Sequence, residues 1–210
     1  MFFSLAVFFN RASIIISILI TLLFALTYLV KHKNWKLITL FLAFFTISTV
    51  WILNRPIVKT KFEEIVNTDY LNITDYNNGI NSRILSWKCS IENIKNTGFW
   101  GHGINNSRSL LRDCYKDIAG ENSVPYLEKY NSHNLFLQTT MDLGFVGLGI
   151  LLLIYFYVLY VGITHRDYLT ISYFIVIFIF GLTESFLNRQ WGIIFFALFT
   201  PFLLNRKIGQ

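Results

Sequence analysis

The sequence predicts an all-α, polytopic transmembrane protein that carries a partly helical extracytoplasmic loop domain. Its 210 residues are 54% hydrophobic and 18% aromatic, and only 14% of them are charged. Soluble domains carry about a quarter charged residues, so this composition indicates a membrane protein. The apolar content also excludes a disordered chain, which has too little apolar surface to offset the entropy of folding.

Four or five apolar runs are predicted to cross the membrane, because a spanning helix needs about 20 mostly apolar residues. In chain order they are residues 12–30, 37–53, 144–163, 168–187 and the short run 191–204. Residues 1–10 are also apolar, but at about 1.5 Å per residue they reach only about half way across a bilayer. We expect them to be the end of a preceding transmembrane helix, with this chain as the C-terminal part of a longer protein.

Lysine and arginine residues set the orientation that we predict for these helices, because they are retained on the cytoplasmic side of membranes. If each run crosses once, the following basic residues share one side: Lys31, Lys33, Lys36, Arg166, Arg206 and Lys207. Residues 54–143 consequently lie on the opposite side. Their charges nearly cancel, which argues against a nucleic-acid partner although the whole chain has a formal charge of +6.

Three regions follow from this topology. Residues 1–53 form an N-terminal transmembrane hairpin with the helix stump, residues 54–143 form the loop domain, and residues 144–210 form the C-terminal transmembrane helices. Polar side chains are concentrated in the middle region, so we expect the active site there.

A first helix is expected inside the loop domain after the turn signal at residues 77–79, with Asn81 or Ser82 as its N-cap. Its expected apolar face repeats every three or four residues and consists of Ile84, Trp87, Ile91 and Ile94. Arg83 lies on the same stripe, which is an unusual position for a charged residue if that face is only core.

Glycines mark the rest of the loop domain. In GFWGHG, residues 98–103, they permit a tight turn or a close approach by a ligand, and Gly98 suits the left-handed position after a helix. The polar run 105–125 is expected to be a loop with at most a short helix over 109–116. Gly144 is expected to interrupt the helical pattern before the third transmembrane run.

A second helix of the loop domain is expected to begin at Ser132, a good N-cap residue. His133 would then lie in the first helical turn, where the helix dipole disfavours a positively charged imidazole. A neutral imidazole is the form that a general base needs. The position of His133 therefore favours a role in proton transfer.

Cys89 and Cys114 are the two cysteines of the chain. Both lie in the loop domain, on the oxidising side of the membrane, where a disulfide is chemically possible. The sequence does not fix their distance, so the bonded and the free state both stay open.

Three residues stand out as candidates for chemistry: Arg11 at the outer mouth of a membrane helix, Arg83 on the apolar stripe and His133 at a helix start. A structural interpretation stays open for each. Arg11 can extend from the span to the interface, and Arg83 can pair with Asp75 or Glu92. His133 can be a buried histidine whose hydrogen bonds are satisfied.

Further candidates for the pocket are Trp100, His102, Asn134, Glu184 and Arg189. For Glu184 and Arg189 the sequence favours a structural ion pair over a catalytic role. For His102, in the GHG turn, it favours a structural role over a place in the pocket. Trp100 can stack on the ring of a ligand, although nothing in the sequence requires this.

Motifs along the chain occur in an order that is typical of one membrane family. They are NRAS (10–13), RILSW (83–87), GFWGHGINN (98–106), NSHNLFLQ (131–138), GFVGLG (144–149) and LTESFLNRQWGIIFF (182–196). With these motifs the chain resembles the C-terminal half of the O-antigen ligase and O-antigen polymerase family over essentially its whole length. It departs from the family at Asn10, where Ser is more usual, and at Ala12, where Gly is frequent.

The resemblance implies a multi-pass glycosyltransferase of the bacterial inner membrane whose active face is periplasmic. Its donor would be an oligosaccharide or polysaccharide on undecaprenyl diphosphate. The acceptor would be a lipid A core sugar for a ligase or a lipid-linked repeat unit for a polymerase, and the sequence does not separate the two. By position, Arg11 and Arg83 match the family's diphosphate-binding arginines, and His133 matches its essential histidine.

The sequence contains no acidic metal-binding motif, so we expect catalysis without a metal ion or another cofactor. Two interpretations from other classes stay open beside the enzyme: an inactive membrane fragment of a larger protein and a small transporter. The transporter is disfavoured because the predicted spans are nearly free of charge.

Overall fold

The computed structural model describes residues 75–208 without a gap and, before them, positions 36, 39–40, 43–44, 46–47, 50, 54–56 and 59–60. The chain divides into two compact units, residues 1–74 and 75–210. Arg11 and the predicted run 12–30 lie outside the described residues, as does the predicted stump 1–10.

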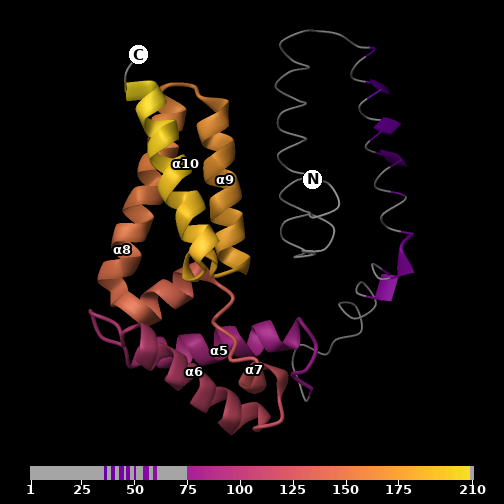
Figure 1. Cartoon of the computed structure of the whole chain (residues 1–210), viewed down its shortest axis with the longest axis vertical. Coiled ribbons are helices and arrows are strands. Elements are labelled where there is room, and N and C mark those ends of the chain that lie inside the picture. The colour runs from indigo at the N-terminus through magenta and orange to yellow at the C-terminus, as the bar shows by residue number, and fades with distance from the viewer. Residues whose placement is uncertain are drawn as a thin grey trace. The chain divides into compact units, whose positions relative to one another are not determined.

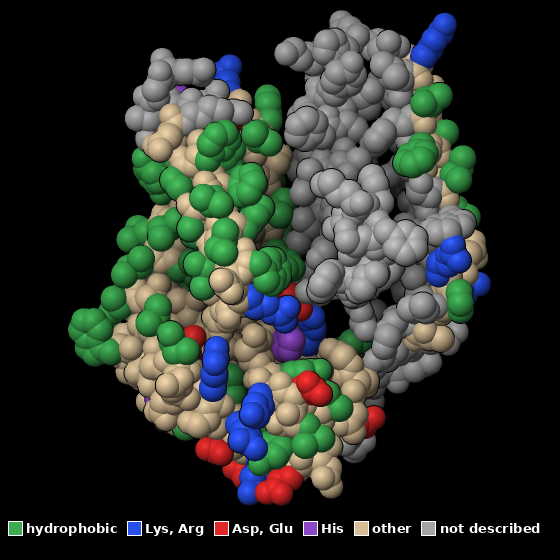
Figure 2. Space-filling model, viewed as in Figure 1, with side chains coloured by type: hydrophobic (Ala, Val, Ile, Leu, Met, Phe, Trp, Pro, Cys, Tyr) green, Lys and Arg blue, Asp and Glu red, His purple; other side chains and the backbone are tan. Residues whose placement is uncertain are grey.

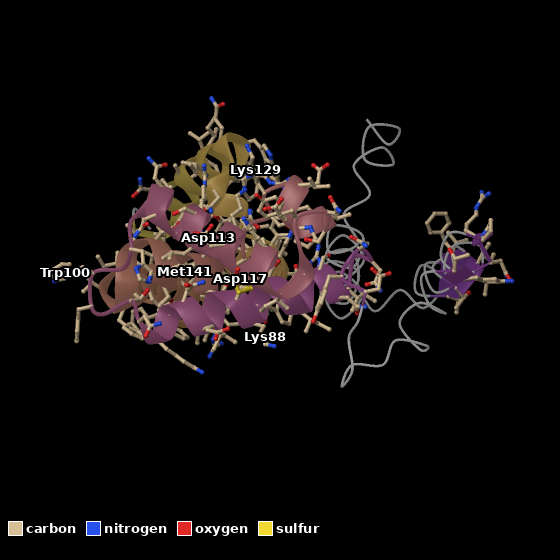
Figure 3. The ribbon with its side chains drawn as sticks, turned by 90° about the horizontal axis from the view of Figure 1, so that it is seen from below. Lys88, Trp100, Asp113, Asp117, Lys129 and Met141 are labelled. Carbon is tan, nitrogen blue, oxygen red and sulfur yellow. A yellow bond between two sulfur atoms is a disulfide. The ribbon has the colours of Figure 1, made fainter. Side chains whose placement is uncertain are left out.

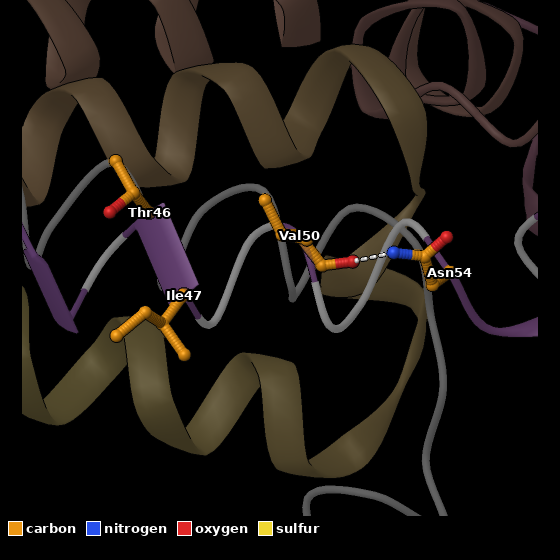
Figure 4. A pocket seen from close by; sticks show the side chains of 4 residues that line it. All are labelled: Thr46, Ile47, Val50 and Asn54. Atoms are coloured by element: carbon orange, nitrogen blue, oxygen red, sulfur yellow. Dashed lines mark hydrogen bonds between the residues drawn. The ribbon is translucent and has the colours of Figure 1, made fainter.

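In the first unit, the described positions between 39 and 50 are helical, in agreement with the helix predicted over 37–53. Thr46, Ile47, Val50 and Asn54 line a mostly apolar surface there (Figure 4). The side-chain amide of Asn54 donates a hydrogen bond to the carbonyl oxygen of Val50 over 2.9 Å. These four side chains include no titratable group, so this surface does not suggest acid–base chemistry.

The second unit has two layers of helices (Figure 1). One layer is a bundle of three long helices, α8 (Leu135–Thr164), α9 (Tyr168–Thr183) and α10 (Gln190–Ile208). Across one end of this bundle lies the second layer, which contains α5 (Asn81–Lys95), α6 (Ile104–Ala119) and the short α7 (Val124–Leu127). The described residues contain helices and no strand, which confirms the all-α prediction for this part of the chain.

The bundle is held together by large apolar and aromatic side chains. Its buried residues are Leu135, Leu151, Tyr155, Val158, Tyr173, Ile177, Phe186 and Leu203. The outward faces are also apolar, because Leu153, Tyr160, Leu198 and Phe202 are all more than half exposed. Figure 2 shows hydrophobic side chains spread over the bundle, whereas charged side chains gather over the second layer. Apolar surface on both faces is what a lipid environment requires.

Among the described helices, α8 alone is long and apolar enough to cross a membrane. The predicted crossing at 144–163 agrees with its second part, which ends at Thr164. The predicted span 168–187 is shorter than expected, because α9 ends at Thr183 and a 3-10 turn, η1 (Phe186–Asn188), follows. The helix predicted over 191–204 extends further, as α10. Crossing by α9 and α10 therefore stays a prediction.

The second layer has its own core beneath a disulfide. Cys89 of α5 is bonded to Cys114 of α6, which settles the alternative that the sequence left open. Leu85, Leu111 and Tyr115 are fully buried around this bond. Burial raises the pKa of the Tyr115 hydroxyl to about 12, because the charged phenolate loses its hydration in the core.

Two predictions about the helical region and the buried face of this layer were wrong. The region predicted as mostly loop over 105–125 contains the 16-residue helix α6, because Ser107, Leu111 and Tyr115 recur every four residues on one buried face. The buried face of α5 is also not the predicted isoleucine stripe. It consists of Asn81, Ser82, Leu85, Ser86, Cys89 and Ser90. Small residues allow close packing, and the hydroxyls of Ser86 and Ser90 bond to carbonyl oxygens one turn earlier.

The start of α5 also differs from the prediction. Neither Asn81 nor Ser82 caps the helix through its side chain. Instead, Oδ1 of Asn78 in the predicted turn accepts hydrogen bonds from the backbone N–H groups of Ile80 and Asn81. An asparagine earlier in the chain thus supplies the acceptor that a capping residue normally provides.

The second layer contacts the bundle where a glycine-containing loop packs against Gly144 of α8. Gly144 has a non-helical backbone, with φ of 68°, and kinks α8, as the sequence predicted for that position. The loop 98–103 lies against this kink: the N–H of His102 donates to Met141 O over 2.8 Å and that of Gly103 to Asp142 O over 3.0 Å. A Cβ atom on Gly101 would collide with the backbone at Gly144. Gly101 therefore permits a close approach by the backbone of α8.

Candidate active site

The candidate site lies where α8 begins and α9 ends. Asn134 is the N-cap of α8, because its Oδ1 accepts hydrogen bonds from the N–H groups of Phe136 and Leu137. Its side-chain amide donates to Leu182 O over 3.1 Å, and its backbone N–H donates to Ser185 Oγ over 3.1 Å. Asn134 therefore fixes the start of α8 against the end of α9.

Glu184 is the acidic centre of this junction. The backbone leaves the helical conformation at Glu184, directly after α9. Its side chain is only 7% exposed. One carboxylate oxygen, Oε1, accepts a hydrogen bond from Arg83 Nη2 over 2.5 Å, and the other, Oε2, lies 3.4 Å from His133 Nδ1. A buried carboxylate needs such partners because its charge is otherwise costly to bury.

Arg83 reaches this junction from α5. Its Nη1 donates to the carbonyl oxygen of Thr183 over 2.7 Å, in addition to the bond with Glu184. Thr183 is the last residue of α9, where carbonyl groups lack helical partners and the helix dipole is negative. The side chain remains 32% exposed, so the guanidinium can present its remaining N–H donors to a ligand. Arg83 therefore pairs with Glu184, which is distant in sequence, and not with Asp75 or Glu92, the partners that the sequence suggested.

His133 does not lie where the sequence predicted. It precedes α8 instead of occupying its first turn, and its backbone φ is 44°. The predicted N-cap, Ser132, bonds instead through its hydroxyl to Gln138 Oε1 over 2.6 Å. The helix dipole argument therefore does not apply to His133. Glu184, which faces its Nδ1, is the local charge that orients it.

The His133 ring is held in place on several sides, but one nitrogen has no partner. Its backbone N–H donates to Asn131 Oδ1 over 2.9 Å, and its carbonyl oxygen faces Trp87 Nε1 at 3.4 Å. The Tyr130 ring packs edge-on against it at 4.9 Å between centroids. Nε2 is buried and forms no hydrogen bond with the described residues. A buried, unpaired nitrogen in a native fold needs an explanation, and a bound substrate group provides one.

The structure does not bring all predicted pocket residues together. The side chain of Trp100 is 80% exposed and projects outward at the edge of the molecule (Figure 3). His102 has a structural contact, from Nε2 to the carbonyl oxygen of Asn93 over 3.2 Å. Arg189 forms no ion pair with Glu184, which corrects the pairing that the sequence favoured. Arg11 lies outside the described residues.

Sequence reasoning missed a buried polar chain next to the site. Gln138 and Asp142 lie one turn apart on α8 and are joined by a hydrogen bond of 3.0 Å. Ser107 of α6 donates to Asp142, and Ser132 donates to Gln138. The signal was present as two polar residues at helical spacing in an otherwise apolar helix. These bonds join α6, α8 and the segment that carries His133.

The geometry thus combines three chemical capacities in one place, where Figure 2 shows basic, acidic and histidine side chains gathered at the junction of the layers. Arg83 supplies a planar, fixed cation suited to phosphate oxygens. A carboxylate facing Nδ1 favours the imidazole tautomer in which Nε2 carries the lone pair. His133 can therefore accept a proton at Nε2, and Glu184 can stabilise the resulting positive ring.

Comparison with known proteins gives one family. A profile of the family described as O-antigen ligase matches residues 1–152, which is more than half of the chain. The matched region includes Arg83 and His133, whereas Glu184 lies beyond it. Among curated proteins, none matches the chain.

Proposed function

Because the chain belongs to the O-antigen ligase family, and is therefore a membrane enzyme of the ligase and polymerase type, we propose a specific reaction for it. It transfers a glycan from undecaprenyl diphosphate to a sugar hydroxyl of the lipid A core on the periplasmic face of the inner membrane. The observation that carries this proposal is the unpaired, buried Nε2 of His133 beside Glu184 and Arg83.

His133 acts as the general base in this proposal. The acceptor hydroxyl oxygen attacks the anomeric carbon of the donor, and its proton passes to Nε2. Nδ1 faces the Glu184 carboxylate at 3.4 Å, which stabilises the imidazolium that forms. The bond between the anomeric carbon and the diphosphate oxygen breaks in the same step. This single displacement inverts the configuration at the anomeric carbon.

Arg83 binds the leaving group. The undecaprenyl diphosphate takes the electron pair of the broken bond, so negative charge grows on its oxygens. A guanidinium that is already oriented by Thr183 O and Glu184 stabilises this charge without reorganising. Arg11 is the second diphosphate ligand in the proposal, on the basis of its position in the NRAS motif. The proposed step needs no metal ion.

Two features support the periplasmic side. The Cys89–Cys114 disulfide is typical of proteins folded in an oxidising compartment, which the periplasm is and the cytoplasm is not. Arg166 follows the opposite end of α8, and the positive-inside rule predicts that this end faces the cytoplasm. We propose that α9 and α10 cross the bilayer beside α8, because their exposed apolar faces would otherwise contact water.

Deletion of the gene, followed by complementation, tests this function. With wild-type protein we expect long glycan on lipid A, and with His133→Ala we expect the polymer to remain on its lipid carrier. His165→Ala is the matched control, because His165 is exposed at the other end of α8 and should leave transfer intact. Undiminished transfer by His133→Ala would exclude the base role. Accumulation of single lipid-linked repeats in the deletion strain would instead identify a polymerase, the second function open to this family.

A further inference from the structure

Apolar side chains are exposed around the kink of α8, at the edge of the second layer. Phe99 and Trp100, in the loop 98–103, are 71% and 80% exposed. Leu143 and Phe145, on either side of Gly144, are about half exposed. We call these four residues, three of which are aromatic, the aromatic rim. Such large exposed apolar groups are unfavourable in water and usually mark a contact surface.

The rim is tied to α8 by its backbone. The carbonyl oxygen of Phe99 lies against Gly144 and faces the N–H of Val146 at 3.4 Å. His102 and Gly103 bond to the carbonyl oxygens of the preceding turn of α8. The loop is therefore held at the level of Gly144 along α8.

The level of Gly144 follows from the length of the apolar helix. From Phe145 to Thr164, α8 is long enough to extend about 30 Å, which is the thickness of the hydrocarbon core of a bilayer. No charged residue occurs in this part. If this part spans the core, Gly144 lies at its outer boundary, and Phe99 and Trp100 lie in the interfacial region. Aromatic rings with a polar N–H edge are enriched at that depth.

We infer that the aromatic rim is a membrane-interface anchor, in which Phe99 and Trp100 bind among the lipid headgroups of the outer leaflet. The second layer is then attached to the lipid surface at the end of α5 as well as through the bundle. The inference rests on the membrane placement of α8 in the proposed function, but it does not depend on the transfer reaction.

Fluorine NMR of the full chain in phosphatidylcholine and phosphatidylglycerol nanodiscs tests this anchor. The protein is labelled with 5-fluorotryptophan, and the Trp100 resonance is identified by its loss in Trp100→Phe. Broadening is compared between a lipid with a nitroxide near its headgroup and a water-soluble gadolinium chelate. Asp117→Trp, on the exposed side of α6, supplies the aqueous reference. Phe156→Trp, near the middle of the apolar part of α8, supplies the bilayer reference.

We expect the lipid nitroxide to broaden the Trp100 resonance severalfold more than that of Trp at position 117, with the gadolinium chelate giving the reverse order. Broadening of Trp100 by gadolinium alone, while position 156 stays protected, would overturn the anchor but leave the membrane placement intact. Exposure of position 156 to gadolinium would overturn the placement itself. Protection of Trp100 from both agents would show that a second protein surface covers the rim, and it would also overturn the inference.

Discussion

The α8–α10 bundle and the α5–α7 layer are stabilised in different ways. The bundle is apolar both inside and outside, and aromatic rings such as Tyr155 and Phe178 pack against one another in it. The layer has a small core, a disulfide and serine hydroxyls that bond to their own helix. The charged groups that can take part in a reaction lie where the bundle and the layer meet. The difference teaches that this site depends on how the two layers are joined, so a change in either layer can affect it.

The largest effect is expected from Glu184→Gln, which removes the charge shared by the two layers. Arg83 and His133 would both lose their ionic partner, and the imidazolium formed in the reaction would lose its stabilising carboxylate. We expect glycan transfer to fall by about 10²–10³-fold, a range typical for loss of assisted proton transfer. A transfer assay in proteoliposomes measures this.

Glu92→Gln is the matched control for that experiment, because Glu92 is exposed on α5 and outside the site. It should leave transfer unchanged. Equal activity of the Glu184 and Glu92 variants would mean that Glu184 has no part in the reaction.

Loss of the disulfide is expected to affect the layer and spare the bundle. The bond closes a loop with a sequence separation of 25 residues, so its removal in Cys89→Ser with Cys114→Ser should cost about 3 kcal/mol of stability. Hydrogen exchange should then accelerate in α5 and α6 but not in α8. Equal acceleration in both layers would show that they unfold as one unit.

Arg83→Lys tests the cation at the border. Lysine keeps the charge but cannot bond to Thr183 O and Glu184 at once with a planar group. We expect transfer to fall by about 10- to 100-fold, which corresponds to the loss of about one hydrogen bond to a charged group. The same change at Arg112 of α6, whose guanidinium lies over the Tyr126 ring of α7, should have little effect. Similar losses at both positions would argue against a specific role for Arg83.

The smallest effect is expected at the glycine contact between the layers. Gly101→Ala introduces a Cβ atom into the backbone near Gly144, which should cost about 1–3 kcal/mol through overpacking. Gly98→Ala has a similar positive φ but open space around the new atom, so only the backbone strain of about 1 kcal/mol remains. Thermal unfolding in nanodiscs compares the two variants. A greater loss for Gly98→Ala would contradict the close contact.

Sequence reasoning was most successful where one residue determines the local backbone. The kink at Gly144 and the left-handed Gly98 follow from the freedom of glycine at positive φ, and both are present. It failed for α5, where the isoleucine stripe was taken as the core face. Trp87 and Ile91 are exposed there, while serines are buried. A small residue at a close helix contact gives no hydrophobic signal, so periodicity alone could not identify that face.

Three of the residues singled out from the sequence, Arg83, His133 and Glu184, lie together in the structure, but their contacts were not predicted. Arg83 and His133 were identified from their positions, and the structure brings both to Glu184. The sequence paired Glu184 with nearby Arg189 instead. Its actual partner Arg83 is separated by 101 residues, and such a contact depends on how the two layers pack. The start of α8 was misplaced because Ser132 and Asn134 are both good capping residues, and only the tertiary bonds of each decide between them.

The Cys89–Cys114 bond has a consequence for the connectivity of the chain. Together with the peptide backbone it closes a covalent ring that contains the end of α5, the loop with Phe99 and Trp100 and the first part of α6. A protease that cuts once inside this ring therefore leaves a single molecule, with both new ends still attached through the two sulfur atoms. Under reducing conditions the same cut would release two chains, so the disulfide decides whether a cut in the exposed loop divides the molecule.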